Sequence, residues 1–226
     1  MIKRALVTGA SSGIGLACVK KLLSLDYEVY GMARDFSKCD ISDDNFTPIM
    51  IDLTKEKNFP SIKELHIMIH AAGLGYFAPH EELKVSQIEE MIALNLTAPL
   101  LLSRHYLRTL KQHSGYIFNI NSISGIEPAL FGAAYGATKA GLSHFGTSLF
   151  KEARKSGLKV ININPDITKT AFFDDLHFQA SEDALAYIEP EDIAQTIEDV
   201  LKMREGTVIT DITIQPQKFQ IQKKKK

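Results

Sequence analysis

The sequence has few cysteines, no long apolar run and no excess of charge of one sign. Cys18 and Cys39 are the two cysteines among 226 residues, and neither CxxC nor a Cys/His cluster occurs, which argues against a disulfide framework or structural zinc. The 26 Lys plus Arg balance 27 Asp plus Glu, so the basic field of a nucleic-acid binder is missing. No apolar run reaches the about 18 residues of a membrane span, and residues 1–8 are too short for a signal peptide. We therefore expect a cytoplasmic protein without nucleic-acid or membrane partners.

What is present is an ordinary globular composition, with 45% hydrophobic and 23% charged residues. Short β-branched runs predict seven strands, over residues 5–8, 28–32, 48–52, 66–70, 116–120, 160–164 and 208–212. Amphipathic stretches predict helices over residues 14–25, 85–110, 134–155 and 190–203. Because parallel strands need long crossovers, this alternation predicts an α/β fold with a parallel sheet and helices on both faces.

Neither a linker-like stretch nor an internal repeat divides the chain. We expect one domain over residues 1–215 and a polar, Lys-rich tail over residues 216–226, with a disordered, solvated end. Two irregular segments, residues 36–47 and 171–189, follow strands at the edge where doubly wound sheets bind ligands. The second is interpreted as a short substrate loop or lid, with a solvated surface connection as the alternative.

A glycine-rich turn, Thr8-Gly9-Ala10-Ser11-Ser12-Gly13-Ile14-Gly15, joins the first predicted strand to the first helix. Glycine allows a tight turn and a close approach of backbone N–H groups, and a helix N-terminus offers free donors to a phosphate. We interpret the turn as a dinucleotide site; glycines that merely permit close packing are the alternative. The residues assigned to it are Thr8, Gly9, Ser11, Ser12, Gly13, Ile14 and Gly15.

Arg34 and Asp35 follow the second strand, where dinucleotide folds distinguish a ribose 2′-hydroxyl from a 2′-phosphate. An arginine fork suits the phosphate, so Arg34 favours NADP(H). Asp35 leaves NAD(H) open, since a carboxylate there either binds the free ribose hydroxyl or pairs with Arg34.

Tyr135 and Lys139 are four residues apart in a predicted helix, so their side chains share one face. An ammonium near a phenol stabilises the phenolate and is expected to lower the tyrosine pKa, which favours proton exchange with a carbonyl or alcohol. Ser122 ends the fifth strand at the same sheet edge, and Asn95 lies in the long helix, where its amide is expected to hold a water that connects Lys139 to solvent.

This ordered set, TGxxxGxG, Asn95, Ser122 and Tyr135-x-x-x-Lys139, resembles the short-chain dehydrogenase/reductase family over nearly the whole chain. The resemblance implies one doubly wound Rossmann domain with seven strands in the order 3-2-1-4-5-6-7. It also implies hydride transfer between a nicotinamide and a carbonyl or alcohol, with Tyr135 as acid/base, Ser122 polarising the substrate oxygen, Lys139 binding the ribose and Asn95 supporting a proton relay. Proteins similar to this one commonly form homodimers or homotetramers. Further cofactor contacts implied by the family are Asp52, Leu53, Ala71, Ala72, Gly73, Pro165, Thr168 and Thr170, besides Tyr135 and Lys139.

Two departures from the family pattern concern the loops after the fourth and sixth strands. Ala71-Ala72-Gly73 replaces the usual Asn-Ala-Gly, and Asp166 replaces the glycine of Pro-Gly, which adds a side chain, a charge and a backbone restriction. After Thr170, the aromatic residues Phe172, Phe173 and Phe178 either line an apolar pocket or act as a plain hydrophobic anchor.

The histidines are scattered without a ligand spacing, so we expect no metal. The favoured function is an NADP(H)-dependent carbonyl reductase or alcohol dehydrogenase acting on a small molecule. The alternatives are an NAD-preferring dehydrogenase and a non-catalytic dinucleotide-binding regulatory or scaffold protein, in which Asp166 disables the nicotinamide pocket.

Overall fold

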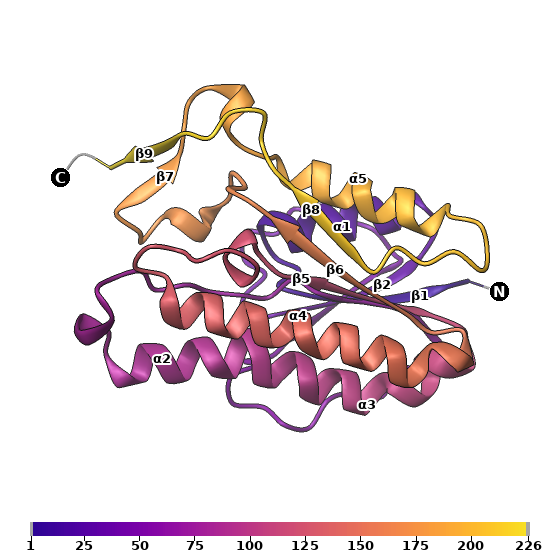
Figure 1. The fold of residues 1–226 in the computed structure, drawn as a ribbon. Coiled ribbons are helices and arrows are strands. Elements are labelled where there is room, and N and C mark those ends of the chain that lie inside the picture. The colour runs from indigo at the N-terminus through magenta and orange to yellow at the C-terminus, as the bar shows by residue number, and fades with distance from the viewer. Residues whose placement is uncertain (1, 225–226) are drawn as a thin grey trace.

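The computed structural model describes residues 2–224 (Figure 1). Seven strands form one sheet in the order β3-β2-β1-β4-β5-β6-β8, and all neighbouring strands in it are parallel. The predicted doubly wound sheet is thus confirmed, with β8 as the seventh strand. The strands are β1 Arg4–Thr8, β2 Glu28–Ala33, β3 Phe46–Met50, β4 Leu65–His70, β5 Tyr116–Ile120, β6 Lys159–Pro165 and β8 Asp211–Ile214.

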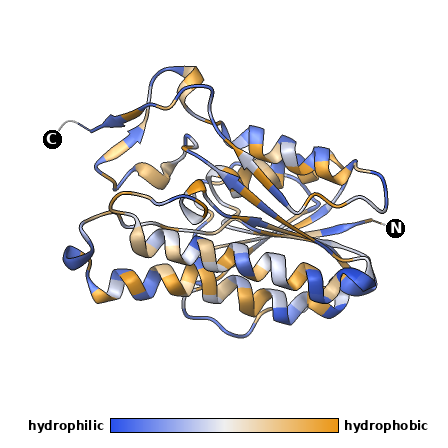
Figure 2. Ribbon diagram, viewed as in Figure 1, coloured by the Kyte–Doolittle hydropathy of each residue, from blue (hydrophilic) through white to orange (hydrophobic). Residues whose placement is uncertain are grey.

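Helices cover both faces of the sheet, as the resemblance implied (Figure 1). Helices α1 (Gly13–Ser24) and α5 (Pro190–Leu201) lie side by side on one face. Helices α2 (Val85–Ile92), α3 (Ala98–Gln112) and α4 (Ala133–Ala153) lie on the other. Successive strand residues point to opposite faces, so two buried apolar clusters form, with Val7 in the first and Leu6 in the second. In Figure 2, the helices on both faces of the sheet carry hydrophobic and hydrophilic residues in alternation.

The helix expected over residues 85–110 is interrupted by a π-helical segment, η2 (Ala93–Thr97). Pro99 follows at the start of α3 and has no N–H to donate to the carbonyl of Asn95 four residues earlier. Regular α-helical bonding is therefore not available there, and the Ala98 N–H bonds the carbonyl of Ala93, five residues back. The interruption places Asn95 in the irregular turn.

A second, two-stranded sheet pairs β7 (Phe178–Ala180) antiparallel with β9 (Ile221–Lys223) (Figure 1). The expectation of a disordered C-terminal end is wrong for this segment, because its backbone bonds the expected substrate loop. Lys224 extends the contact: its Nζ donates to the carbonyls of Phe173 and Asp174, both at 2.6 Å. Residues 225–226 of the predicted tail lie outside the described residues. The short helical turns are η1 (His80–Glu82), η3 (Ile123–Gly125), η4 (Arg154–Ser156), η5 (Ala171–Phe173) and η6 (Ala184–Ala186).

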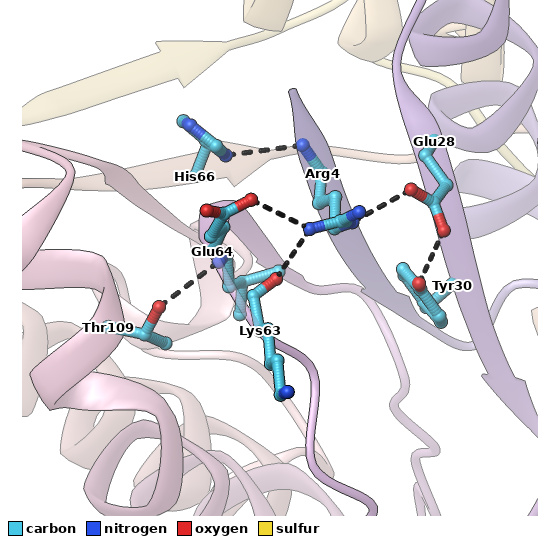
Figure 3. Close-up of polar contacts among 8 residues, drawn as sticks. Arg4, Glu28, Tyr30, Lys63, Glu64, His66 and Thr109 are labelled. Atoms are coloured by element: carbon cyan, nitrogen blue, oxygen red, sulfur yellow. Dashed lines mark hydrogen bonds and ion pairs between the residues drawn. The ribbon is translucent and has the colours of Figure 1, made fainter. Parts of the chain in front are cut away.

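An ion-pair network ties together the amino ends of three strands (Figure 3). Arg4 Nε contacts Glu28 at 2.7 Å, and Arg4 Nη1 contacts Glu64 at 3.0 Å. Glu28 also accepts a hydrogen bond from the Tyr30 hydroxyl, and the Arg4 backbone N–H donates to Nδ1 of His66. The network holds the edge of the sheet opposite the glycine turn.

Within the described part of the chain, the helices fall short of the length and apolarity of a membrane span.

Candidate active site

The glycine turn lies at the carboxyl ends of the strands and requires glycine at three positions. Gly9 has φ +69°, and a Cβ there would lie 2.9 Å from Ala72 Cα. Gly13 has φ +50°, and a Cβ on Gly15 would lie 2.1 Å from the Gly9 carbonyl oxygen. The turn is therefore too tight for side chains at these positions. Ser12 precedes α1 without a side-chain cap, which leaves the first N–H groups of the helix available for an anion.

Thr8, which we predicted as a cofactor contact, holds the turn in place. Its buried Oγ1 accepts hydrogen bonds from the backbone N–H groups of Ala71 at 3.1 Å and Ala72 at 3.0 Å. These bonds join the end of β1 to the loop after β4 and keep Gly9 against Ala72. Since the backbone of Ala71 makes the contact, the family's asparagine side chain is not needed for it.

Arg34 and Asp35 do not pair with each other in the structure. The Asp35 carboxylate accepts hydrogen bonds from the Ser37 N–H at 2.7 Å and the Ser37 hydroxyl at 2.8 Å, and these bonds lower its pKa. Arg34 is exposed at the end of β2. The ion pairs found among residues 2–224 do not include Arg34, so its guanidinium is available to an anionic group beside the glycine turn.

Asp52 and Leu53, the expected adenine contacts, follow β3. Asp52 Oδ1 accepts from the Thr54 hydroxyl at 2.6 Å and the Thr54 N–H at 3.0 Å, which lowers the Asp52 pKa. Leu53 is buried in the core on the α3 side of the sheet. The carboxylate thus stabilises its own turn.

Ser122, Tyr135 and Lys139 come together where β5 meets α4. Ser122 follows β5, and Tyr135 and Lys139 lie in the first turns of α4, with Lys139 Nζ 5.8 Å from the centroid of the Tyr135 ring. Ser122 Oγ accepts the Ser124 N–H at 3.1 Å, and Lys139 Nζ donates to the Ile120 carbonyl at 2.9 Å. The three residues predicted to share one substrate atom therefore meet at the sheet edge that carries the glycine turn.

Burial determines the pKa values of this group. Loss of water raises the pKa of Tyr135 to about 12, and a hydrogen bond with Ser122 offsets part of that rise. Burial also lowers the pKa of Lys139 to about 8. The tyrosine pKa thus moves in the opposite direction to the one we expected from a nearby ammonium, because desolvation of the phenolate is the largest effect.

Asn95 joins three segments around Lys139. Its Nδ2 donates to the Leu74 carbonyl at 2.8 Å and to Thr138 Oγ1 at 3.1 Å, and its Oδ1 accepts the Leu74 N–H at 3.0 Å. Gly73 lies between, since a Cβ on it would be 3.3 Å from Lys139 Nζ and 3.5 Å from Asn95 Oδ1. We expected this amide to hold a water; in this structure its partners are protein groups, and it positions the loop after β4 beside Lys139.

The loop after β6 returns to the glycine turn through Thr170. A Cβ on Gly13 would lie 3.2 Å from Thr170 Cγ2, and Thr170 Oγ1 accepts the Phe172 N–H at 3.3 Å. Thr168, just after Pro165, is buried and donates through its hydroxyl to the carbonyl of Asp166 at 3.0 Å. Asp166 is not among the positive-φ positions of the described residues, and its Oδ1 accepts the Ile167 N–H at 2.8 Å. The backbone restriction that we expected from losing a glycine there is absent.

Two phenylalanine rings cover Tyr135: Phe172, which the sequence singled out as an apolar pocket residue or anchor, and Phe77, which sequence reasoning missed. Phe77 and Phe172 have ring centroids 5.2 Å and 5.8 Å from that of Tyr135. Gly75 lies between all three rings, since a Cβ on it would be 2.7 Å from Phe172, 2.8 Å from Phe77 and 3.1 Å from Tyr135. The local signal was weak: a glycine two residues from a phenylalanine in a loop after a strand does not specify which ring it will meet.

The comparisons with known proteins agree with this geometry. A family model described as short chain dehydrogenase matches residues 3–180. An uncharacterised oxidoreductase of Staphylococcus epidermidis is 30% identical over 227 residues, which cover 95% of this chain and 97% of that protein. A short-chain dehydrogenase of Pyricularia oryzae is 34% identical over 173 residues, covering 71% of this chain and 61% of that protein.

Solved structures share the fold. An alcohol dehydrogenase from the archaeon Thermococcus sibiricus, complexed with 5-hydroxy-NADP, superposes with a TM-score of 0.84 at 21% identity, covering 96% of this chain and 97% of that one. A 4-hydroxyisoleucine dehydrogenase complexed with NADH superposes with a TM-score of 0.81 at 25% identity, covering 95% and 97%. The match over most of the chain and the shared fold place this protein in the short-chain dehydrogenase family, as an oxidoreductase.

Proposed function

We propose that the protein is an NADP(H)-dependent oxidoreductase that interconverts a carbonyl compound and its alcohol, with Tyr135 as the acid/base. The observation that carries the proposal is the meeting of Tyr135, Ser122 and Lys139 at the sheet edge that also bears the glycine turn. A non-catalytic scaffold of the same fold would have no need of a buried lysine whose charge costs free energy.

The residues at this edge fit a nicotinamide dinucleotide. The turn of Gly9, Gly13 and Gly15 offers backbone N–H groups where a Cβ would collide, which suits a pyrophosphate. Arg34 suits the 2′-phosphate of NADP(H), and Asp35, already hydrogen-bonded to Ser37, competes less for a ribose hydroxyl. Solved relatives carry either NADP+ or NADH, so the preference for NADP(H) rests on Arg34 of this chain.

The roles of the chain's residues follow from their environment. A bound nicotinamide would supply the hydride for the carbonyl carbon, and Tyr135 Oη would give its proton to the carbonyl oxygen as that oxygen takes up the π-electron pair. A Tyr135 pKa of about 12 keeps that proton on the phenol at neutral pH, so the residue is ready to donate it. The Ser122 hydroxyl holds the substrate oxygen, and the Lys139 ammonium stabilises the phenolate left behind.

The proposed acid/base is tested with Tyr135→Phe, which keeps the ring but removes the hydroxyl. We expect turnover of carbonyl compounds to fall at least about 100-fold, as for loss of a general acid, while NADPH affinity stays within twofold. Unchanged turnover would exclude Tyr135 as the acid/base. The fluorescence of bound NADPH measures cofactor affinity independently of turnover.

The cofactor preference is tested by titrating the wild type and Arg34→Ala with NADPH and NADH at the same ionic strength. We expect Arg34→Ala to weaken NADPH binding roughly 10-fold or more and to leave NADH binding almost unchanged, because only the 2′-phosphate pairs with the guanidinium. Tighter binding of NADH than of NADPH by the wild type, with little effect of Arg34→Ala, would favour the NAD-preferring alternative. Binding of neither cofactor by the wild type would overturn the proposed function, whereas binding without turnover of any carbonyl compound would favour the scaffold alternative.

A further inference from the structure

We propose that the substrate is a neutral carbonyl compound whose chain ends in an apolar, flat group, and that Phe77 selects it. The inference rests on the proposed function and names its substrate class. The observation that carries it is a cluster of four phenylalanine rings, two of which, Phe77 and Phe172, pack on the ring of Tyr135; we call it the aromatic cluster. Its members are Phe77, Phe172, Phe173 and Phe178.

Phe77 is the centre of the aromatic cluster. Its ring centroid lies 5.2 Å from Tyr135, 5.3 Å from Phe178 and 6.4 Å from Phe172. Phe173 completes the cluster, 5.3 Å from Phe172 and 5.6 Å from Phe178. These separations and the mostly edge-to-face angles are those of favourable aromatic pairs. A compound that reaches the Tyr135 hydroxyl must therefore lie against these rings or replace one of them.

Two glycines make room for the Phe77 ring. A Cβ on Gly75 would lie 2.8 Å from Phe77, and a Cβ on Gly132 would lie 3.0 Å from it. Side chains on either side would therefore push the ring away from Tyr135. Gly75 and Gly132 therefore hold the flat Phe77 ring in place beside Tyr135, where it offers an aromatic partner to a flat substrate group.

The surroundings of the aromatic cluster disfavour an anionic substrate. Lys224 Nζ is taken up by the carbonyls of Phe173 and Asp174, and Lys169 Nζ lies 4.6 Å from the centroid of the Tyr187 ring. Asp174 and Asp175 add negative charge to the same loop. A substrate carboxylate near this loop would thus lose water beside carboxylates, while Lys224 and Lys169 already have other partners.

Exposed apolar residues extend the apolar surface outward from the aromatic cluster. Ile126, Leu130 and Phe131 are exposed in the segment that connects Ser122 to Tyr135. The carbonyl of Phe131 accepts the Ala78 N–H at 3.1 Å, which joins this segment to the one that carries Phe77. Apolar side chains are therefore exposed on a segment that is joined to the one carrying Phe77.

The test compares three methyl ketones of one skeleton with the NADPH-loaded enzyme. In 4-phenyl-2-butanone, 2-pentanone and 4-oxopentanoate, the carbonyl carries the same methyl group, and the far end is a phenyl ring, a methyl group or a carboxylate. We expect kcat/KM to be roughly 10- to 100-fold higher for the phenyl ketone than for 2-pentanone, from burial of the ring against aromatic neighbours. We expect the carboxylate compound to be the poorest of the three.

The variant Phe77→Ala should lower kcat/KM for 4-phenyl-2-butanone roughly 10-fold and change that for 2-pentanone less than about threefold, because only the phenyl ring loses its partner. Phe77→Leu, which keeps an apolar side chain of similar size, is a second variant if Phe77→Ala unfolds. Phe150→Ala is the matched control, since Phe150 is also half-buried but lies about 22 Å along α4 from Tyr135. It should leave the selectivity among the ketones unchanged.

Calorimetric titration of the enzyme–NADP+ complex with 4-phenyl-2-butanone provides a readout that does not depend on turnover. Binding that Phe77→Ala weakens and Phe150→Ala does not would support the proposal. Equal or better use of 4-oxopentanoate, or selectivity that does not respond to either Phe77 variant, would overturn it while leaving the proposed oxidoreductase intact. Failure to bind NADPH would instead overturn the proposed function.

Discussion

Replacing Gly146 in α4 by alanine should destabilise the protein, although alanine is the better helix former. A Cβ at this position would lie 2.3 Å from Asn162 Oδ1 and 2.5 Å from Asn119 Nδ2. These two buried side chains form a hydrogen bond of 3.0 Å between β5 and β6. Asn162 Nδ2 also donates to the Ser143 carbonyl and to Asp211, so the added methyl group would disturb contacts from β6 to α4 and β8.

The expected size of the effect follows from three contributions. Alanine improves helix propensity over glycine by about 1 kcal/mol. Overpacking costs about 1–3 kcal/mol, and leaving a buried hydrogen-bonding group without its partner costs about 1–3 kcal/mol. We therefore expect a net loss of about 3 kcal/mol of unfolding free energy. For a chain of this length, that loss lowers Tm by roughly 6–12 °C.

Gly141→Ala, in the same helix, is the matched control. A Cβ there would meet only the end of the Leu96 side chain at 3.3 Å, which can move, so propensity should dominate and stability should stay equal or rise by up to about 1 kcal/mol. Both variants are compared with the wild type by thermal and urea unfolding, followed by circular dichroism. If Gly146→Ala were as stable as Gly141→Ala, the packing argument would be refuted.

Three further predictions concern charge, the C-terminal segment and the cysteines. Lys139→Met should abolish turnover and raise stability at pH 7 by roughly 1–2 kcal/mol, since it removes a buried ammonium but also its bond to the Ile120 carbonyl. Because the folded-state pKa of Lys139 is lowered to about 8, the buried charge costs its full free energy below that pH, and this cost fades as the pH rises toward the unfolded pKa of about 10.4. The variant's gain in unfolding free energy over the wild type, measured by urea unfolding, should therefore be smaller at pH 10 than at pH 7. An equal gain at both pH values would contradict the burial argument. Ending the chain after Gln220 removes β9 and the Lys224 bonds, so chymotrypsin should cut the loop of residues 171–189 faster; unchanged cleavage would show that the segment does not hold the loop. A thiol reagent at pH 7 should label the half-buried Cys39 and not Cys18, whose pKa burial raises to about 12; rapid labelling of both in the folded protein would count against that burial.

Most of the fold was predictable because it depends on local patterns. The strand order followed from the alternation of strand and helix together with the family resemblance, and all seven strands of the main sheet are present. Boundaries were less accurate: the last strand was expected over residues 208–212 and is β8, Asp211–Ile214. The break at η2 was not predicted because it depends on one missing N–H group, at Pro99. The pairing of β9 with β7 was not predicted because the two segments are distant along the chain.

The sequence predicted the residues that meet at the candidate site, but it did not predict what several of them contact. Thr8 was assigned to the cofactor, and its Oγ1 also bonds the backbone of the loop after β4, more than 60 residues away, which the sequence did not predict. Asn95 was assigned to a water and bonds Leu74 and Thr138. Polar side chains of this kind satisfy whichever groups folding brings near them, and a motif does not carry that information.

The sequence by itself determined the fold class, the family and the residues that converge at one sheet edge, because hydrophobic period and glycine-rich turns act over short stretches of chain. Only the tertiary structure decided that burial has a larger effect on the Tyr135 pKa than the nearby ammonium that we expected to lower it. Burial under Phe77 and Phe172 raises its pKa, and Gly75 and Gly132 leave space for those rings. Desolvation depends on the number and kind of atoms that surround a group, and these atoms come from segments that only the folded chain brings together.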